Sequence, residues 1–291
     1  MDNTEKNRGR SIEGKAITVV YIVSQAHSGS TLLSQMIGSH SKAVTIGEVK
    51  DADELVTPCG CGAARVIDCA FWKNVDGKLE AHGDRRLTQL DLTASEPVRF
   101  AEDNFSFFRA VHEVTNSAVI VDSSKSLSRL KDLMRVSSLH VVPIFLRRDP
   151  PGVVNSNVRK GRPWFQMTLR HYAGMRRCIE YFRNVEHISL DYTLLASDPY
   201  NELQRVMMEI GLAIESEQMQ WADRPNHAVN GNRMRFGRDS TIRPDIAWRT
   251  ELSVFQQMVI RLLTNKVVLE SDFFAAITRI ARSVLRKDSQ P

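Results

Sequence analysis

Residues 24–31 (SQAHSGST) are small and polar, and their types and spacing suit the binding of an anion. They follow the apolar run 19–23, and apolar residues at helical spacing continue after them to Gly38. Backbone N–H groups of such a loop and of the next helical turn point at one spot, where the helix dipole adds positive potential. Gly29 would let an anion approach the backbone, because a Cβ would obstruct it. The pattern indicates a phosphate-binding loop between a strand and a helix.

This loop differs from a Walker A motif, which ends in Gly-Lys-Ser/Thr and whose lysine reaches the outer phosphates of a nucleotide. Here Ser30 and Thr31 follow Gly29, and no lysine lies nearby. An ordinary strand-to-helix turn of an α/β protein would also fit the loop by itself. The anion site therefore needs support from other parts of the chain.

Predicted strands alternate with predicted helices along the chain. Strands are expected near residues 19–23, 43–48, 118–122, 140–148 and 187–190, and helices over 31–38, 97–116 and 126–135 and from about residue 150. The alternation predicts a P-loop-containing α/β fold with three layers, α/β/α, around a central mostly parallel sheet. The segment 51–100 has no such periodicity and is expected to be an irregular insert.

Two cations follow strands of this predicted sheet. Lys125 comes after strand 118–122, and Arg148 ends strand 140–148. The carboxyl ends of parallel strands lie at one edge of the sheet, where ligands of α/β proteins gather. We therefore expect the loop at 24–31, Lys125 and Arg148 to lie together and to form one anion site.

Composition and charge agree with a soluble globular protein that binds an anion. Of 291 residues, 42% are hydrophobic and 25% are charged, which is usual for soluble domains. The net charge of +5 suits an anionic ligand and gives no indication of nucleic-acid binding. Residues 1–10 lack the apolar core of a signal peptide, and no apolar run reaches the ~20 residues of a membrane span. We expect a cytoplasmic protein with a disordered lead at 1–14 and one domain over 15–291.

Four segments together resemble the sulfotransferases that use 3′-phosphoadenosine 5′-phosphosulfate (PAPS) as donor. SQAHSGSTLL (24–33) resembles the family's 5′-phosphosulfate loop. RRDPPGVVNS (147–156) resembles its 3′-phosphate motif, in which an arginine closes a strand and a serine follows eight residues later. LDYTLLASDP (190–199) resembles a later signature of the family, and VDSSKSLSRL (121–130) the segment that supplies a lysine. The resemblance covers about residues 17–240 and points to the tyrosylprotein, carbohydrate and related bacterial branches.

The resemblance implies in-line transfer of a sulfuryl group from PAPS to a hydroxyl or amine, which leaves adenosine 3′,5′-bisphosphate (PAP). The implied catalytic residues are Glu48 as base, Lys125 at the leaving phosphate, and His27. In the tyrosylprotein branch a Gly-Glu pair after the same helix supplies the catalytic glutamate, and Gly47-Glu48 matches it. Glu48 could instead only pair with Lys125 or lie on the surface. The chemistry depends on positioning and charge stabilisation, so it requires no metal.

The resemblance also assigns the donor-binding residues. His27, Ser28, Gly29, Ser30 and Thr31 are expected around the 5′-phosphate, and Arg148 and Ser156 on the 3′-phosphate. The basic, Gly-centred segment 227–236 is expected to close over the donor, with Arg233 or Arg235 touching the 3′-phosphate or the acceptor. A solvated basic turn is the alternative for that segment.

His27 departs from the family pattern, because most relatives carry arginine or lysine there. An imidazole is fully charged only below its pKa, which is near 6.5 when unperturbed. A dianionic donor should raise the pKa of His27 and charge it at neutral pH. Whether it replaces an arginine completely, or only fills the loop, stays open.

Two other functions compete with sulfuryl transfer. One is a P-loop phosphotransferase that uses ATP, which the missing Walker A lysine disfavours. The other is a non-catalytic nucleotide-binding module. The acceptor is expected to be a small molecule, glycan or lipid, with Trp164, Phe165 and His171 as candidate lining residues. The sequence indicates no nucleic-acid partner and gives no oligomeric state.

The cysteine segment and the C-terminal tail each allow more than one interpretation. Cys59, Cys61 and Cys69 resemble part of a zinc site that His82 or Cys178 could complete. A disulfide and plain thiols in a substrate loop compete with zinc, although a reducing cytosol disfavours the disulfide. The tail 271–291 has an apolar stripe at helical spacing, which predicts packing on the domain or, alternatively, docking on an anionic membrane surface.

Overall fold

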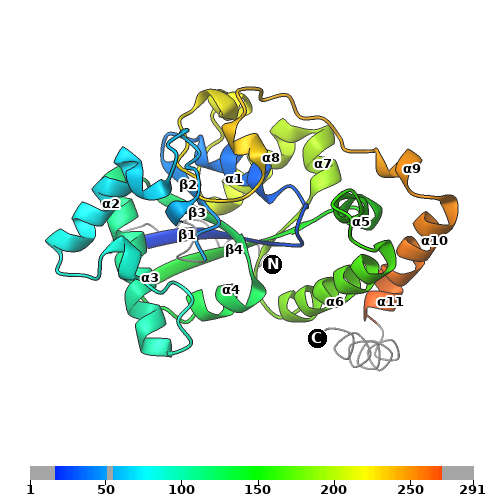
Figure 1. The fold of residues 1–291 in the computed structure, drawn as a ribbon, viewed down its shortest axis with the longest axis horizontal. Coiled ribbons are helices and arrows are strands. Elements are labelled where there is room, and N and C mark those ends of the chain that lie inside the picture. Colours follow the sequence, from blue (N-terminus) through cyan, green and yellow to red (C-terminus); the bar gives the residue numbers. More distant parts are fainter. Residues whose placement is uncertain (1–16, 51–54, 271–291) are drawn as a thin grey trace, which may run out of the picture.

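The computed structural model describes residues 17–50 and 55–270, and a five-stranded parallel sheet forms its centre (Figure 1). The strand order is β2-β3-β1-β4-β5, and every neighbouring pair is parallel. The strands are β1 (Ile17–Ser24), β2 (Ala43–Gly47), β3 (Val119–Lys125), β4 (Leu139–Arg147) and β5 (Ile188–Asp191). The predicted α/β fold with a mostly parallel sheet is confirmed.

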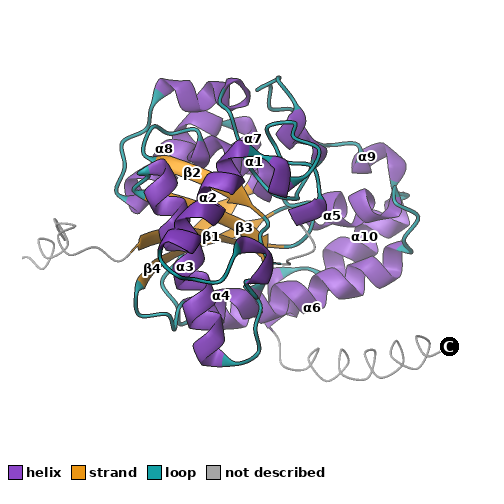
Figure 2. Cartoon of the chain, turned by 60° about the vertical axis from the view of Figure 1, so that its left-hand side comes forward, coloured by secondary structure: helices purple, strands orange, loops and turns teal. Residues whose placement is uncertain are grey.

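Helices cover both faces of the sheet, so the described residues form three layers (Figure 2). The helices are α1 (Ser30–Gly38), α2 (Ala70–Ala81), α3 (Pro97–Thr115), α4 (Leu127–Leu133), α5 (Pro150–Val158), α6 (Trp164–Phe182), α7 (Tyr192–Ser197), α8 (Pro199–Ile210), α9 (Trp248–Glu251), α10 (Val254–Leu263) and α11 (Lys266–Glu270).

The central strand β1 is buried on both faces, which explains its unbroken apolar sequence. Successive side chains of a strand point to opposite faces. Val19, Tyr21 and Val23 accordingly join the hydrophobic core that includes residues of α2, α3 and α6. Val20 and Ile22 join a second hydrophobic core, with residues of α1 and α8. The sheet is thus held between two apolar layers, and only its edges and strand ends are available for chemistry.

Local sequence signals explain where the helices next to the site begin. Ser126 precedes α4, and its hydroxyl accepts the N–H of Arg129. Pro150 and Pro151 open α5, where a missing N–H costs nothing because the first helical turn has no intrahelical acceptor for it. Lys125 ends β3 and Arg148 directly follows β4, and each helix begins two residues later, at Leu127 and Pro150.

The expectation of an irregular segment over 51–100 is wrong in part. Residues 70–81 form α2, which packs against α3 through Trp72 and Phe107, whose rings stack with centroids 6.0 Å apart. The apolar residues Trp72, Val75 and Leu79 are buried and recur at helical spacing. Glycine and charged residues between them hid this period in the sequence.

The sequence predictions for the disordered lead at 1–14 and for the tail at 271–291 lie outside the described residues. Within residues 17–50 and 55–270, no helix combines the length and the apolar character that crossing a bilayer would require.

Candidate active site

The loop after β1 has the backbone shape of an anion cradle. His27 and Gly29 both have positive φ, at 66° and 90°, and α1 begins at Ser30. The N–H groups of a first helical turn have no partner inside the helix. The hydroxyl of Ser28 is buried and has no hydrogen-bond partner among the described residues. A buried hydroxyl without a partner fits a ligand oxygen, so the loop suits the 5′-phosphate that the sequence assigned to it.

Gly29 is needed for a reason that the sequence did not indicate. A Cβ built on Gly29 would overlap the aromatic ring of Tyr192, at the start of α7. Its φ of 90° also lies in the left-handed region that favours glycine. The group that approaches Gly29 closely is therefore the Tyr192 ring, which covers one side of the loop.

Glu48 and Lys125 form an ion pair at the carboxyl ends of β2 and β3. Glu48 is 8% exposed, and Lys125 lies at the last position of β3. Gly47 lets β2 approach Val229, whose carbonyl oxygen accepts the Glu48 N–H at 2.7 Å. A Cβ on Gly47 would overlap that Val229 backbone. The Gly-Glu pair thus has a structural reason for its glycine and places a buried carboxylate beside a lysine.

Backbone strain concentrates around these groups. Among the described non-glycine residues, four have positive φ, and His27, Lys125 and Asn230 are three of them. Such residues are uncommon, and strained backbone clusters at active sites. Asn230 is next to Val229, so all three strained residues belong to segments that surround Glu48 and the loop.

Arg148 connects the loop after β1 with the start of α5. Its Nη1 donates to the carbonyl oxygen of His27 at 2.6 Å, and its Nη2 donates to Asp245 Oδ2 at 2.8 Å. Its guanidinium lies over the Tyr192 ring, 4.7 Å from the ring centroid, and its side chain is 8% exposed. The residue predicted to hold the 3′-phosphate is therefore also a clamp on the phosphate loop.

Ser156 lies on α5 one turn beyond Gly152, the residue against which the Arg148 guanidinium packs. Its hydroxyl donates to the Gly152 carbonyl oxygen at 2.9 Å. Residues four apart lie on one face of a helix. Arg148 and Ser156 therefore lie on the same side of Gly152, whereas their contact with a 3′-phosphate stays a prediction.

Four cations surround His27. Burial first, and then the positive charges of Lys160, Lys125, Arg148 and Arg162, lower the pKa of its imidazole to about 4. Lys160 Nζ lies 3.3 Å from His27 Nε2. In the ligand-free protein His27 is therefore neutral at pH 7. The predicted charging of His27 concerns the donor-bound protein and stays a prediction.

Binding of PAP should make His27 take up a proton. Phosphate charges offset the surrounding cations and raise the pKa of His27, so near pH 6 the bound state holds more protons than the free state. Relative to His27→Asn, the affinity of wild type for PAP should then increase as pH falls below about 6.5, because protonation of the PAP phosphates affects both proteins alike. Calorimetry near pH 6, in buffers of different ionisation enthalpy, measures the number of protons taken up when PAP binds. The number for wild type minus the number for His27→Asn gives the uptake by His27. Equal proton uptake in the two proteins would contradict a charged His27.

The late segment 227–236 lies beside Glu48 and the phosphate loop. Asn232 donates its N–H to the Thr31 hydroxyl at 3.0 Å, which couples the segment to the first turn of α1. Arg233 is exposed. Arg235 is buried, and its guanidinium donates to the carbonyl oxygens of Gly231 and Pro58 at 3.1 and 3.2 Å. This geometry gives Arg235 a part in holding the loop, whereas a contact of either arginine with the donor stays a prediction.

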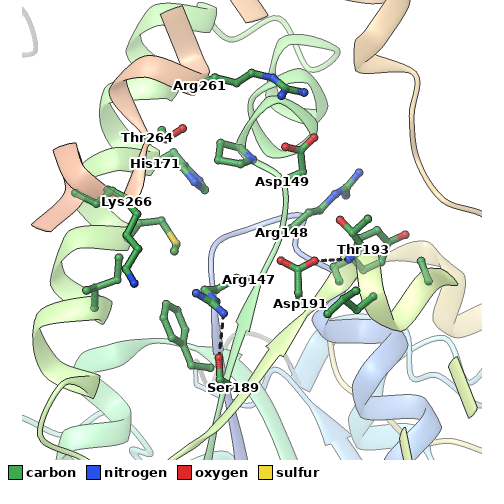
Figure 3. A pocket seen from close by; sticks show the side chains of 18 of the residues that line it. Arg147, Arg148, Asp149, His171, Ser189, Asp191, Thr193, Arg261, Thr264 and Lys266 are labelled. Atoms are coloured by element: carbon green, nitrogen blue, oxygen red, sulfur yellow. Dashed lines mark hydrogen bonds between the residues drawn. The ribbon is translucent and has the colours of Figure 1, made fainter. Parts of the chain in front are cut away.

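A cavity of about 1020 Å³ opens beside Arg148 (Figure 3). Residues of β4, β5, α6, α10 and α11 line it, and Tyr192, Thr193 and His171 are among them. Of the three residues proposed for the acceptor pocket, only His171 lines this cavity. Trp164 packs instead in a small core with Val154 and Trp248, and Phe165 is 48% exposed.

Sequence reasoning missed two charged residues of the site. Lys160 belongs to the basic run 159–162, and that run was a signal that could have been used. Asp245 lies in a segment without periodicity, and no sequence pattern marks it as the partner of Arg148. Lys160 is 133 residues from His27 in the sequence, and Asp245 is 97 residues from Arg148.

Asp122 directly follows the apolar residues of β3, where a P-loop nucleotide hydrolase would carry a magnesium-binding aspartate. Here Asp122 is fully buried, with Oδ1 accepting the Ser124 N–H at 2.8 Å and Oδ2 accepting from the Arg129 guanidinium at 3.3 Å. Its carboxylate therefore supports the turn that leads to Lys125, and its oxygens already have partners.

The fold and the strand-end site together define an α/β protein with a candidate anion-binding loop. Comparisons with known proteins narrow this class. No protein-family model matches the chain, and no curated protein matches it. It is similar in structure to a sulfotransferase domain from the curacin biosynthetic pathway, with a TM-score of 0.53 and 18% identity over 84% of this chain and 96% of that one. A sulfotransferase domain from the olefin synthase of Synechococcus PCC 7002 gives a TM-score of 0.48 and 18% identity over 84% of this chain and 92% of that one.

The likeness to the curacin-pathway domain concerns the fold, since the identity is low. The chain has the fold of a sulfotransferase domain. This agrees with the fold that the motifs predicted from the sequence.

Proposed function

We propose that this protein transfers a sulfuryl group from PAPS to a hydroxyl or amine of a small-molecule, glycan or lipid acceptor. The observation that carries the proposal is the convergence of Lys125, Arg148, Lys160 and Arg162 on His27. Glu48 and Asp245 pair with two of these cations, Lys125 and Arg148, which leaves an excess of positive charge around His27 in the ligand-free protein. A ligand with phosphate at two positions and a sulfate would offset them, because attraction between opposite charges is strong where water is excluded.

The ion pair of Glu48 and Lys125 supports the chemical step. In this step the acceptor oxygen forms a bond to sulfur while the bond from sulfur to the 5′-phosphate oxygen breaks. Glu48 takes the proton of the acceptor hydroxyl, and Lys125 stabilises the charge that develops on the leaving phosphate. Lys125 turns from Glu48 to the phosphate, so Glu48 is left unpaired and able to accept the proton.

Arg148 supports the grip on the other end of the donor. It has a planar guanidinium suited to a phosphate, and Tyr192 and Thr193 line the cavity next to it. The same side chain binds the carbonyl oxygen of His27. One residue therefore couples the two ends of the site, with adenosine in the cavity and the 5′-phosphate at the start of α1.

The competing ATP-dependent phosphotransferase has less support. The loop after β1 contains no lysine, and Lys125 and Lys160 come from other elements. Asp122, the candidate for magnesium, is buried and bound to Arg129. An ATP-dependent phosphotransferase would therefore need its phosphate-binding lysine and its magnesium-binding carboxylate from other parts of the chain.

Two measurements on the full chain test the proposal. Binding of PAP should be stronger than binding of ATP in calorimetry, because only PAP offers a 3′-phosphate to Arg148. Labelled PAPS incubated with pooled hydroxyl and amine acceptors should yield labelled sulfated product and PAP. Preference for ATP would favour the phosphotransferase, and PAP binding without turnover would favour the non-catalytic module.

A further inference from the structure

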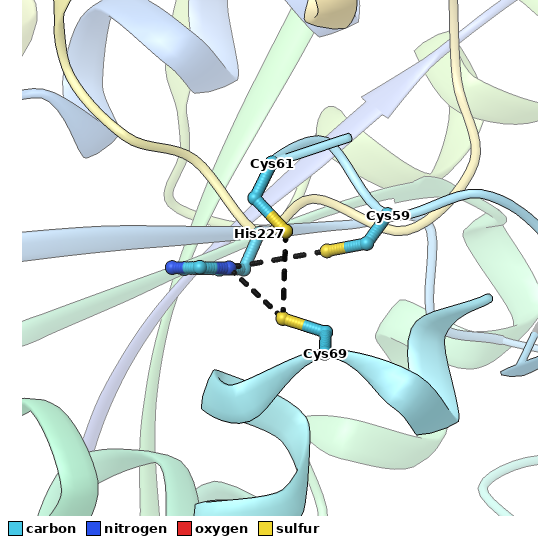
Figure 4. Close-up of side chains that lie close together, drawn as sticks. All are labelled: Cys59, Cys61, Cys69 and His227. Carbon is cyan, nitrogen blue, oxygen red and sulfur yellow. Dashed lines mark hydrogen bonds between the residues drawn. The ribbon is translucent and has the colours of Figure 1, made fainter. Parts of the chain in front are cut away.

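Four potential metal ligands meet outside the candidate active site, and they come from two distant parts of the chain. Cys59, Cys61 and Cys69 precede or begin α2, and His227 belongs to the late segment (Figure 4). Their ligand atoms all lie within 4.8 Å of one another. The sequence had suggested His82 or Cys178 as the fourth ligand. That suggestion is wrong for His82, which pairs with Glu113 at 2.8 Å, and Cys178 is buried in α6.

The distances within this cluster fit one tetrahedral ion. Cys61 Sγ lies 3.5 Å from Cys69 Sγ, and His227 Nδ1 lies 3.3 Å from Cys69 Sγ and 3.9 Å from Cys59 Sγ. Tetrahedral zinc, with bonds of about 2.3 Å to sulfur and 2.05 Å to nitrogen, separates two sulfurs by about 3.8 Å and sulfur from nitrogen by about 3.6 Å. All four cysteines are free of disulfide bonds. The spacing therefore suits a shared ion.

Local structure aims these side chains at one point. Cys59 accepts the Gly62 N–H at 2.9 Å and donates its own N–H to Ala63 at 3.0 Å, so residues 59–63 form a tight turn that carries two of the sulfurs. Cys69 directly precedes α2, so the third sulfur is held at the start of this helix.

The fourth side chain is held by α2 as well. The His227 ring stacks on Phe71, with centroids 4.5 Å apart and planes 3° from parallel. The Trp72 indole N–H donates to the His227 carbonyl oxygen at 3.0 Å. Phe71 thus fixes the plane of the ring while Nδ1 faces the sulfurs.

We propose that Cys59, Cys61, Cys69 and His227 bind one zinc ion, which ties the cysteine segment to the late segment beside Glu48. Three thiolates and an imidazole are the ligands that structural zinc prefers, and the set is complete without water. The site is closed, so the ion is structural and takes no part in the reaction.

The zinc site supports the active site through the backbone. Val229 is two residues after His227, and it bridges β2 by donating to Ile46 at 2.9 Å and accepting from Glu48 at 2.7 Å. Gly60, between two of the cysteines, donates to the Ala228 carbonyl oxygen at 3.1 Å. The ion would therefore fix the strand-like segment that places Glu48.

Metal analysis of the full chain, purified from zinc-supplemented medium, tests the proposal without relying on sulfuryl transfer. Wild type should hold about one zinc per chain, and the exposed ligand variant Cys61→Ser should lose most of it. His82→Asn and Cys178→Ser serve as matched controls and should retain the metal. Wild type without zinc, or equal loss in Cys61→Ser and the controls, would overturn the proposal.

A second measurement uses wild type alone, so its result does not depend on whether a variant folds. Wild type is stripped with a chelator under reducing conditions and titrated with Zn²⁺ or Co²⁺ alone. Zn²⁺ should raise the unfolding temperature, and Co²⁺ should give the visible absorption of a tetrahedral thiolate site with a stoichiometry of about one. No change in unfolding temperature together with no tetrahedral Co²⁺ spectrum would overturn the zinc site. Failure of the proposed enzyme would instead appear as bound zinc without PAP binding.

Discussion

Replacing Glu48 by glutamine should lower turnover by about 10²- to 10⁴-fold, which is the usual contribution of a general base. Glutamine keeps the size of the side chain but cannot take the acceptor proton at neutral pH. Glu48 is buried and bound to Lys125, so its removal also frees that lysine. Affinity for PAP should therefore stay the same or increase, because a negative charge leaves the neighbourhood of the phosphates. Steady-state kinetics with PAPS and calorimetry with PAP measure the two effects.

Glu202→Gln is the matched control for this change. Glu202 forms an ion pair with Arg205 on α8, at 3.1 Å, so its substitution also removes one carboxylate from an ion pair. Its turnover should equal that of wild type. If Glu48→Gln retained near-normal turnover with unchanged PAP affinity, Glu48 would not be the base.

Replacing Arg148 by alanine should weaken PAP binding by about 10- to 100-fold, as expected for the loss of a hydrogen-bonded charge partner. The loss should be much smaller for adenosine 5′-phosphate, which has no 3′-phosphate. Some loss is expected for both ligands, because Arg148 also holds the carbonyl oxygen of His27 and thereby the phosphate loop. The difference between the two ligands therefore measures the 3′-phosphate contact.

Arg135 provides the control for a change of net charge. It is exposed, forms an ion pair with Asp132 at 3.3 Å, and is not among the described residues that line the cavity. Arg135→Ala should change PAP affinity less than Arg148→Ala does. Equal losses for PAP and for adenosine 5′-phosphate in Arg148→Ala would assign Arg148 to the loop and not to the 3′-phosphate.

Much of the fold could be predicted from the sequence, because its signals are local. Strand β1 is an unbroken apolar run since both of its faces are buried. Prolines at 150 and 151 mark the start of α5. Alternating strands and helices imply parallel strands, and parallel strands bring their carboxyl ends together. This rule was enough to place Lys125 and Arg148 beside the loop at 24–31.

Other features could not be predicted because their causes lie far away in the chain. The ring that requires glycine at position 29 belongs to Tyr192, and the backbone that requires glycine at 47 belongs to Val229. The late segment was expected over the donor, and no local pattern indicated that its backbone is joined to β2 and α1. Helix α2 was missed because its apolar positions are few.

The sequence by itself determined that this protein has a parallel α/β sheet and that a loop, a lysine and an arginine share its strand-end edge. Periodicity and strand order carry that information, since they depend on neighbours in the chain. Only the tertiary structure decided that Glu48 pairs with Lys125, that Arg148 holds the His27 backbone, and that His227 joins three cysteines. These partners are 77, 121 and up to 168 residues apart. Contacts at such separations depend on how whole elements pack, which no local pattern encodes.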